Sequence, residues 1–365
     1  MNKNKYIPQM RPWLGEEECN AIINYLKEDG WLTEYKKTEE FEHVLAEYLG
    51  VKHCIVVSNG TVALTLVGLA LGIKYGDDVI VPNYTMIATP NSMKLIGANP
   101  VFVDVESETL CLDFSLLEKS LTPRTKAIIL VSPNGRYPKC GIDKFLKFAE
   151  EHKLFLIEDA AQALGSFYPD GNHIGTVGIA GTLSFSMPKI ITTGQGGAVI
   201  TNDDDIAFKI RRLKDFGRIK SGIDIHESIG FNFKFTDIQA VIGIEQMKKL
   251  KYRIARKKEI YKLYQEGLKN IKQVHLFNQD LINTTPWFID ILCENRDALA
   301  NYLNENGIGT RLMYPPINKQ QAYNIIGYFP VSEKVGKMGL WLPSFTQITN
   351  EEIFYICDKI KDFYS

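Results

Sequence analysis

The stretch that decides the fold runs from Leu154 to Asn202 and reads LFLIEDAAQALGSFYPDGNHIGTVGIAGTLSFSMPKIITTGQGGAVITN. It opens with an apolar run, Leu154 to Ile157, which is typical of a strand buried on both faces. The run ends in two acids, Glu158 and Asp159. Because ligands of open α/β sheets gather at the carboxyl ends of strands, the sequence predicts a functional site beside these acids.

Two more short strands are predicted in the same stretch, over 182–186 and 198–201. Lys189 follows the first of them, and the glycine-rich turn 194–197 leads into the second. The pattern therefore places Asp159 at one strand end and Lys189 on a loop just past another, with small residues and hydroxyls between them.

A lysine paired with a carboxylate suits pyridoxal 5'-phosphate (PLP). The lysine amine forms a Schiff base with the cofactor's carbonyl, and the carboxylate keeps the ring nitrogen protonated. Lys189 and Asp159 are the candidates for these catalytic roles, and Ser184 or Ser186 is the candidate donor to the phosphate. Taken singly, a loop lysine is usually a solvated charge and a strand-end acid often caps a helix, so the prediction depends on the joint pattern.

The joint pattern resembles the DegT/DnrJ/EryC1/StrS family of sugar aminotransferases over essentially the whole chain. The resemblance implies an α/β fold of the fold-type-I PLP-dependent aminotransferases, with a large, mostly parallel sheet domain and a smaller α+β C-terminal domain. It also implies a homodimer with shared active sites. The motifs that carry the resemblance lie at residues 57–64, 158–166, 184–186, 189, 193–197 and 342–345.

The turn 58–61 precedes an apolar helix and is a candidate phosphate site. Free N–H groups and a positive dipole end make a helix N-terminus attractive to phosphate. In isolation the motif is better explained as an ordinary N-cap. Together with Lys189 and the family resemblance, it predicts that Gly60 and Thr61 cradle the cofactor phosphate.

Further cofactor contacts are implied by the resemblance alone. Met86 stands where the family usually places an aromatic ring over the cofactor, with Tyr84 two residues earlier. Gln162 matches a residue that hydrogen-bonds the cofactor's ring hydroxyl. Asn232 matches an asparagine that reaches across the dimer interface to the partner subunit's cofactor phosphate. Without the resemblance, the alternative explanation of Gln162 is a solvent-facing loop residue, and that of Asn232 is a turn residue.

Several positions depart from the family's pattern in segments that touch substrate in relatives: the loop 132–138, Met86, Pro188 and Asn318. These departures keep two acceptors open. One is a nucleotide-linked 4-keto-6-deoxy sugar used for surface polysaccharide biosynthesis. The other is a small phosphorylated ketone such as dihydroxyacetone phosphate. In both cases the expected amino donor is L-glutamate. A non-catalytic PLP-binding regulator is the alternative from another class, although the complete set of Lys189, Asp159 and Gln162 disfavours it.

Composition narrows the class of protein. The 365 residues have a formal net charge of −1, which disfavours nucleic acid or an anionic membrane as the main partner. No apolar run is long enough to span a membrane, and the N-terminus has no apolar signal segment. The six cysteines are scattered without a C-x-x-C pair, so we expect reduced thiols, no metal site and a cytoplasmic location.

Hydrophobic periodicity predicts alternating strands and helices over residues 1–250, the proposed large PLP-binding α/β domain. A helix over 114–121 is among these elements. A long helix, whose basic run 251–258 is expected to face water, leads into a small α+β domain over 251–365. Its predicted elements are strands over 287–292 and 309–313 and helices over 296–306 and 350–364.

Overall fold

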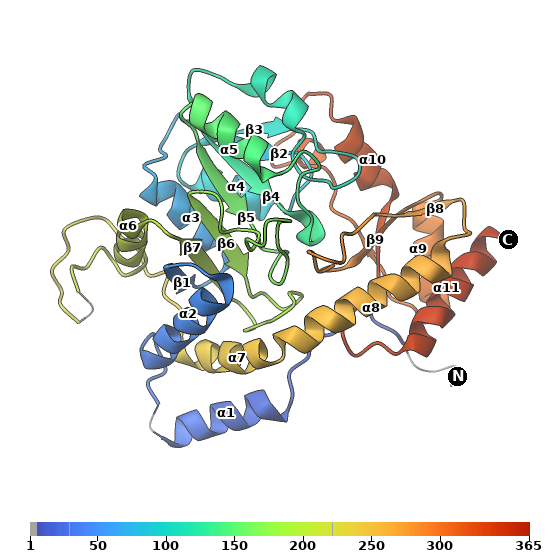
Figure 1. The fold of residues 1–365 in the computed structure, drawn as a ribbon, viewed down its shortest axis with the longest axis horizontal. Helices are drawn as coiled ribbons and strands as arrows, with labels where there is room; N and C mark the ends of the chain where they lie inside the picture. The colour runs from blue at the N-terminus through green and yellow to red at the C-terminus, as the bar shows by residue number, and fades with distance from the viewer. Residues whose placement is uncertain (1–5, 29, 221) are drawn as a thin grey trace.

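A computed structural model of the protein describes residues 6–28, 30–220 and 222–365 (Figure 1). Its larger sheet has the strand order β1-β7-β6-β5-β4-β2-β3. The antiparallel pairs are those that β7 makes with β1 and β6, and the other neighbours pair in parallel, which confirms the predicted mostly parallel sheet. The strands are β1 (His53–Val57), β2 (Asp78–Pro82), β3 (Asn99–Val103), β4 (Thr125–Val131), β5 (Phe155–Asp159), β6 (Ala180–Ser184) and β7 (Gly197–Thr201).

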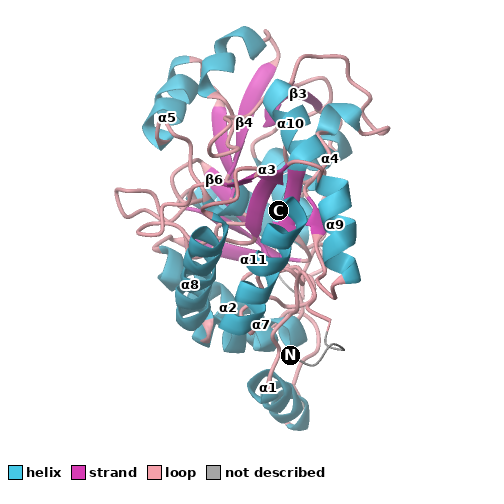
Figure 2. Cartoon of the chain, turned by 90° about the vertical axis from the view of Figure 1, so that its right-hand side faces the viewer, coloured by secondary structure: helices cyan, strands magenta, loops and turns pink. Residues whose placement is uncertain are grey.

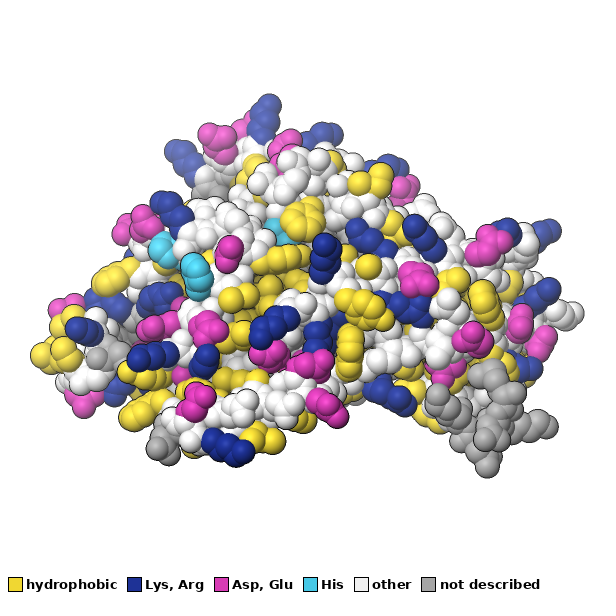
Figure 3. All heavy atoms as spheres, turned by 60° about the horizontal axis from the view of Figure 1, so that its bottom comes forward, with side chains coloured by type: hydrophobic (Ala, Val, Ile, Leu, Met, Phe, Trp, Pro, Cys, Tyr) yellow, Lys and Arg dark blue, Asp and Glu magenta, His cyan; other side chains and the backbone are white. Residues whose placement is uncertain are grey.

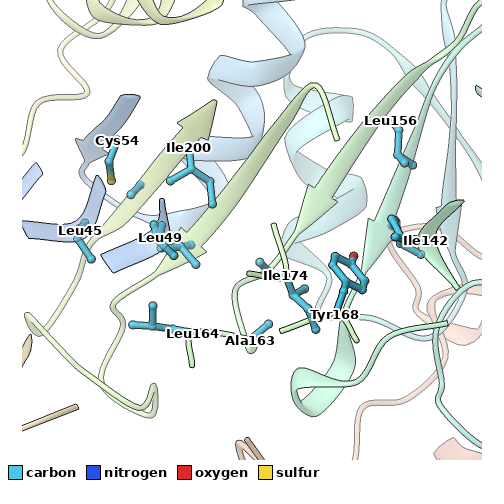
Figure 4. Close-up of a cluster of buried hydrophobic side chains, with 14 of the residues drawn as sticks. Leu45, Leu49, Cys54, Ile142, Leu156, Ala163, Leu164, Tyr168, Ile174 and Ile200 are labelled. Carbon is cyan, nitrogen blue, oxygen red and sulfur yellow. The ribbon is translucent and has the colours of Figure 1, made fainter. Parts of the chain in front are cut away.

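Helices cover both faces of this sheet, because its strands are apolar on both sides. In β1, Cys54 and Val56 face one buried cluster, while Ile55 and Val57 face the other. Figure 4 shows part of the first cluster, with Leu45 and Leu49 beside Cys54 and Ile200. The first cluster is covered by α2 (Lys36–Leu49), α5 (Ile142–Glu151) and α7 (Asp237–Lys248), and the second by α3 (Gly60–Ala70), α4 (Ala88–Leu95) and α6 (Asp204–Lys214). Helix α1 (Glu16–Lys27) packs against α7.

A second sheet lies toward the C-terminus, in the order β10-β11-β9-β8, with antiparallel neighbours. Helices α8 and α11 pack side by side over its core, as Figure 2 shows. The elements are α8 (Leu250–Leu268), β8 (Val274–Leu276), β9 (Ile289–Cys293), α9 (Arg296–Glu305), β10 (Arg311–Leu312), α10 (Pro330–Met338), β11 (Gly339–Leu342) and α11 (Asn350–Tyr364). Helix α8 starts where the boundary between 1–250 and 251–365 was expected; the domain division itself stays a prediction.

Two sequence-based expectations were wrong. The helix expected over 114–121 is a pair of 3-10 turns, Phe114–Leu116 and Glu118–Ser120. Pro123 follows closely and cannot continue a helix, since it lacks an N–H group. The basic run 251–258 does not face water throughout. Arg253 and Lys257 are buried, because Arg253 donates to the carbonyls of Ile190 and Trp13 and Lys257 donates to those of Trp287 and Ser344. In the described ranges, no helix is both long and apolar enough to cross a membrane.

Candidate active site

A cavity of about 530 Å³ opens at the carboxyl ends of β4, β5 and β6. Its lining combines residues from the start of α3, the segment that leads into α4 with the first turn of that helix, and the loop after β6. Three C-terminal residues, Trp287, Arg311 and Tyr314, complete it. The cavity brings together seven of the eight predicted site residues: Gly60, Thr61, Met86, Asp159, Gln162, Ser184 and Lys189.

Asp159 is the last residue of β5 and is buried. The Thr89 hydroxyl donates to Oδ2 at 2.8 Å, and the Ala161 N–H donates to Oδ1 at 3.2 Å. Burial raises the pKa of Asp159, although these two donors and the charge of Lys189 oppose the rise. A carboxylate in this condition is stabilised by a cationic or proton-bearing partner, because such a partner offsets the missing hydration.

Lys189 reaches into the cavity from the loop after β6. Its loss of hydration there lowers its pKa from the usual 10.5 to about 8, with Asp159 opposing this change and Arg311 adding to it. Its Nζ lies 4.2 Å from the centroid of the Trp287 ring. The loss of hydration therefore shifts this amine toward the neutral form, which a nucleophile or general base requires.

Gly60 and Thr61 are the first two residues of α3 and present backbone N–H groups at the cavity. Asn59 is the N-cap, and its side chain accepts from the Val62 N–H at 2.9 Å. Among the described residues, the N–H groups of Gly60 and Thr61 have no acceptor. A Cβ at Gly60 would lie 3.2 Å from the Ser184 Cβ, so glycine lets the turn approach this serine closely. Two free N–H groups beside a hydroxyl match the oxygens of a phosphate.

Gln162 and Met86 have defined orientations at the cavity. The Gln162 Oε1 accepts from the Asn134 N–H at 2.8 Å, which leaves its amide NH₂ as the donor for the cavity. Met86 is 44% exposed and lines the cavity, whereas Tyr84 is 3% exposed and packs toward Tyr314 instead. Of these two candidates for the stacking position, Met86 is therefore the one that faces the cavity.

Glu158, the other acid of the motif, has a structural role. It is buried and accepts from the Tyr168 hydroxyl at 2.7 Å. The N–H groups of Gly175, Val177 and Gly178 also donate to it, at 2.6 to 2.8 Å. The carboxylate thus organises the glycine-containing loop between β5 and β6.

Asn232 lies apart from the cavity within its own chain. It is exposed and pairs with Asp215 in an isolated bridge. It follows a loop with six exposed large hydrophobic residues, namely Phe216, Ile219, Ile223, Ile225, Ile229 and Phe231. The predicted contact with a partner subunit's cofactor stays a prediction.

The departures from the family pattern fall into two groups. Met86 and Pro188 line the cavity. In the loop 132–138, the Arg136 side chain pairs with Asp290 and the Asn134 side chain exchanges hydrogen bonds with the backbone of Phe288, while the Asn134 N–H holds Gln162 at the cavity. Asn318 is buried away from the cavity, between Asn83 and Glu333. Within the single chain, Met86 and Pro188 therefore line the cavity, the loop 132–138 contacts it through Gln162, and Asn318 has a packing role.

Sequence reasoning missed four residues of the site. Thr89 orients Asp159, and Trp287, Arg311 and Tyr314 close the cavity from the C-terminal part. Thr89 is the second residue of α4, the helix that follows β2, so its place at the start of a helix near a strand's carboxyl end was an available signal. The other three lie about a hundred residues or more beyond Lys189 in sequence, and no local pattern marks them.

The donor set fits PLP. It offers an amine for the carbonyl, a buried carboxylate for the ring nitrogen, an amide donor for the ring hydroxyl, and free N–H groups with Ser184 for the phosphate. Among the described residues, no group of acidic, histidine or cysteine side chains is placed to hold a metal ion.

Comparisons with known proteins agree with this fit. The sequence profile of the DegT/DnrJ/EryC1/StrS aminotransferase family matches residues 12–361. GDP-perosamine synthase of Escherichia coli O157:H7 is 38% identical over 366 residues, covering 99% of each chain. The structure of S. venezuelae DesV in complex with a ketimine intermediate superposes with a TM-score of 0.91 at 30% identity, covering 98% of this chain and 99% of DesV. Spr1654 of Streptococcus pneumoniae in its PLP form gives a TM-score of 0.91 at 25% identity, covering 98% of each chain.

Proposed function

Since the chain belongs to the DegT/DnrJ/EryC1/StrS aminotransferase family and is a PLP-dependent aminotransferase, we propose that it moves an amino group from L-glutamate to a nucleotide-linked 4-keto-6-deoxy sugar, for surface polysaccharide biosynthesis. The observation that carries the proposal is the cavity in which Lys189 and Asp159 meet a phosphate-type cradle at Gly60 and Thr61. The similarity to a GDP-perosamine synthase supports the sugar acceptor.

In this proposal Lys189 would hold the cofactor covalently, and Asp159 would keep a proton on its ring nitrogen. Gly60, Thr61 and Ser184 would bind its phosphate. Bound PLP supplies an electron sink for the carbanion left when an α-proton departs.

When its amine is free, Lys189 Nζ would also act as a general base, taking the proton from the donor's α-carbon and carrying it as an ammonium ion. The pKa of about 8 suits this shuttle, because the amine both accepts and releases a proton near neutral pH. Burial raises the pKa of Asp159, and a protonated ring nitrogen held beside it would favour its ionised form, since each charge would offset the burial of the other.

Arg311 supports an anionic donor such as glutamate. It lines the cavity from β10, and its guanidinium lies over the Trp341 ring at 5.4 Å. Within the described part of the chain it forms no ion pair with a carboxylate. A cation without a counter-ion at a substrate cavity attracts a carboxylate or a phosphate.

The assembly proposed is a homodimer in which Asn232 completes the partner's site. The exposed hydrophobic loop before Asn232 supports this interface. Figure 3 shows hydrophobic side chains among charged ones at the edge of the molecule, and Lys and Arg mixed with Asp and Glu rather than gathered as a basic patch. On the face that Figure 3 shows, this mixture of charges supports the proposal that nucleic acid is not a partner. Six free cysteines support a cytoplasmic location.

A two-stage absorbance experiment tests the function. Glutamate first converts the purified PLP-loaded protein to its pyridoxamine phosphate form. GDP-4-keto-6-deoxymannose, other nucleotide-linked 4-keto sugars and dihydroxyacetone phosphate are then added separately. Return of the yellow PLP absorption with a nucleotide sugar is the expected result. Lys189→Ala is the matched control that gives no first stage.

Two outcomes would overturn parts of the proposal. If only dihydroxyacetone phosphate restores the yellow absorption, the acceptor is the small ketone that Met86 and Pro188 leave open. If glutamate produces no conversion of the wild-type protein, glutamate is not the amino donor, and if other amino acids also fail, the regulator becomes the better explanation.

A further inference from the structure

Trp287 makes two contacts with the lysine segment of the site. Its indole N–H donates to the Pro188 carbonyl at 2.7 Å. Its ring face lies 4.2 Å from Lys189 Nζ, measured to the ring centroid. One side chain thus contacts both the amine of Lys189 and the backbone of the residue before it.

A buried lysine holds the backbone of Trp287 in place. Lys257 of α8 donates to the carbonyl oxygens of Trp287 and Ser344. The next residue, Phe288, is held by Asn134, whose side chain donates to its carbonyl at 2.8 Å and accepts from its N–H at 2.6 Å. Trp287 itself is only 4% exposed. The indole is therefore part of a rigid wall rather than a mobile surface group.

We propose that Trp287 is a positioning residue for Lys189. The ring face of Trp287 receives the Lys189 amine whenever this amine is not bonded to the cofactor, and the indole N–H anchors the Pro188 carbonyl. The inference rests on the proposed function for its catalytic meaning, but the contact itself is a property of the cofactor-free chain. The proposed role applies to the stage of the reaction at which the Lys189 amine is free of the cofactor and carries a proton.

The physical need for such a face follows from the charges around the amine. The charged groups that face Lys189 are Asp159, which favours the ammonium form, and Arg311, which disfavours it. Asp159 already accepts from Thr89 and Ala161 and is assigned to the cofactor ring. A ring face stabilises a desolvated ammonium without binding it as tightly as an ion pair would, so the proton remains transferable.

Two substitutions separate the two contacts. Trp287→Phe keeps a ring face but removes the N–H donor, while Trp287→Met keeps an apolar filler and removes both. Trp13→Met is the matched control, because the Trp13 ring lies 5.1 Å from Arg253 Cζ and 5.2 Å from Lys249 Nζ, over cations other than Lys189.

The first measurement uses full-length protein freed of PLP. The pH dependence of reductive methylation of Lys189, quantified by mass spectrometry, reports its proton affinity. We expect this affinity to fall about tenfold in Trp287→Met, by less in Trp287→Phe, and to stay at the wild-type value in Trp13→Met. A wild-type or higher proton affinity in folded Trp287→Met would overturn the proposal.

The second measurement follows loss of deuterium from α-deuterated glutamate to water by the PLP-loaded protein. We expect about tenfold slower loss in Trp287→Met with PLP affinity within about twofold of wild type. If PLP affinity and deuterium loss fall together while the proton affinity of Lys189 is unchanged, Trp287 only supports the wall and the proposal fails. If wild-type protein releases no deuterium, the proposed glutamate donor fails, whereas the first measurement still decides the role of Trp287.

Discussion

Arg136 and Asp290 form a buried ion pair between the loop after β4 and strand β9, and removing one partner should be far more costly than removing both. The Arg136 NH2 and NH1 groups lie 2.6 and 3.2 Å from the two Asp290 oxygens, and its Nε donates to the Thr109 carbonyl at 3.0 Å. The side chains are 4% and 3% exposed. Neither charge can regain water without opening the contact between the two sheets' layers.

The magnitudes follow from this burial. Arg136→Met leaves an unpaired buried carboxylate, and Asp290→Val leaves an unpaired buried guanidinium, so each should lower the free energy of unfolding by about 3 to 5 kcal/mol. The double variant exchanges both charges for apolar groups and should lose only about 1 to 2 kcal/mol, mainly for the Thr109 carbonyl left without its donor. The two single effects are therefore strongly non-additive.

Urea unfolding of the PLP-free protein, followed by tryptophan fluorescence, measures the cycle without a contribution from cofactor binding. Lys139→Met, three residues after Arg136, is the matched control. The side chains of Lys139 and its partner Glu108 are 67% and 57% exposed, so this ion pair should contribute less than about 1 kcal/mol. Single variants that each lose less than about 1 kcal/mol, or a double variant that loses their sum, would refute the reasoning.

Three further predictions concern Lys257 and the proposed active site. Burial lowers the pKa of Lys257 from 10.5 to about 7, so the unfolded chain binds more protons between these values. The unfolding free energy of wild type relative to Lys257→Met should therefore rise with pH over this window, by at most about 1.4 kcal/mol per unit; a flat difference would contradict the burial account. Lys189→Ala and Asn232→Ala homodimers should each be impaired, while refolding them together in equal amounts should restore about a quarter of wild-type turnover, since one site of each mixed dimer is then complete. Absence of restoration would place Asn232 outside the partner's site. Asp159→Asn should lower the rate of the glutamate half-reaction at least about hundredfold while changing stability little, because an amide can still bond Thr89 and Ala161; circular dichroism and stopped-flow absorbance check both parts.

Most of the fold could be predicted from local sequence. The apolar runs of β5 and β7 and the capping box at Thr349 and Glu352 of α11 are signals that depend on neighbours a few residues apart. One failure has a local cause and the other does not. The 114–121 segment has helical periodicity, but Pro123 follows it and cannot continue a helix. The basic run of α8 looks solvated, yet Lys257 is buried because two backbone carbonyls from distant segments accept hydrogen bonds from it.

The site divides in the same way. Asp159, Ser184, Lys189 and the Gly60–Thr61 segment were identifiable because they lie at or just past a strand end or at a helix start, and parallel strands bring such ends to one edge of the sheet. Gln162 was predicted from the family resemblance. The orientation of Gln162, the choice of Met86 over Tyr84, and the structural use of Glu158 required the packed structure, since each depends on which neighbour occupies a hydrogen-bond or ring position.

By itself, then, the sequence determined the α/β architecture, the PLP-binding motifs and the family, because these are written in short-range periodicity and in residues next to strand ends. Only the tertiary structure decided how the C-terminal part completes the cavity. Trp287 meets Pro188 across 99 residues of chain, and Arg136 meets Asp290 across 154. Such contacts arise when apolar burial brings two distant surfaces together and leaves their polar groups to pair in water-poor surroundings, and no local pattern encodes which partner each group will find.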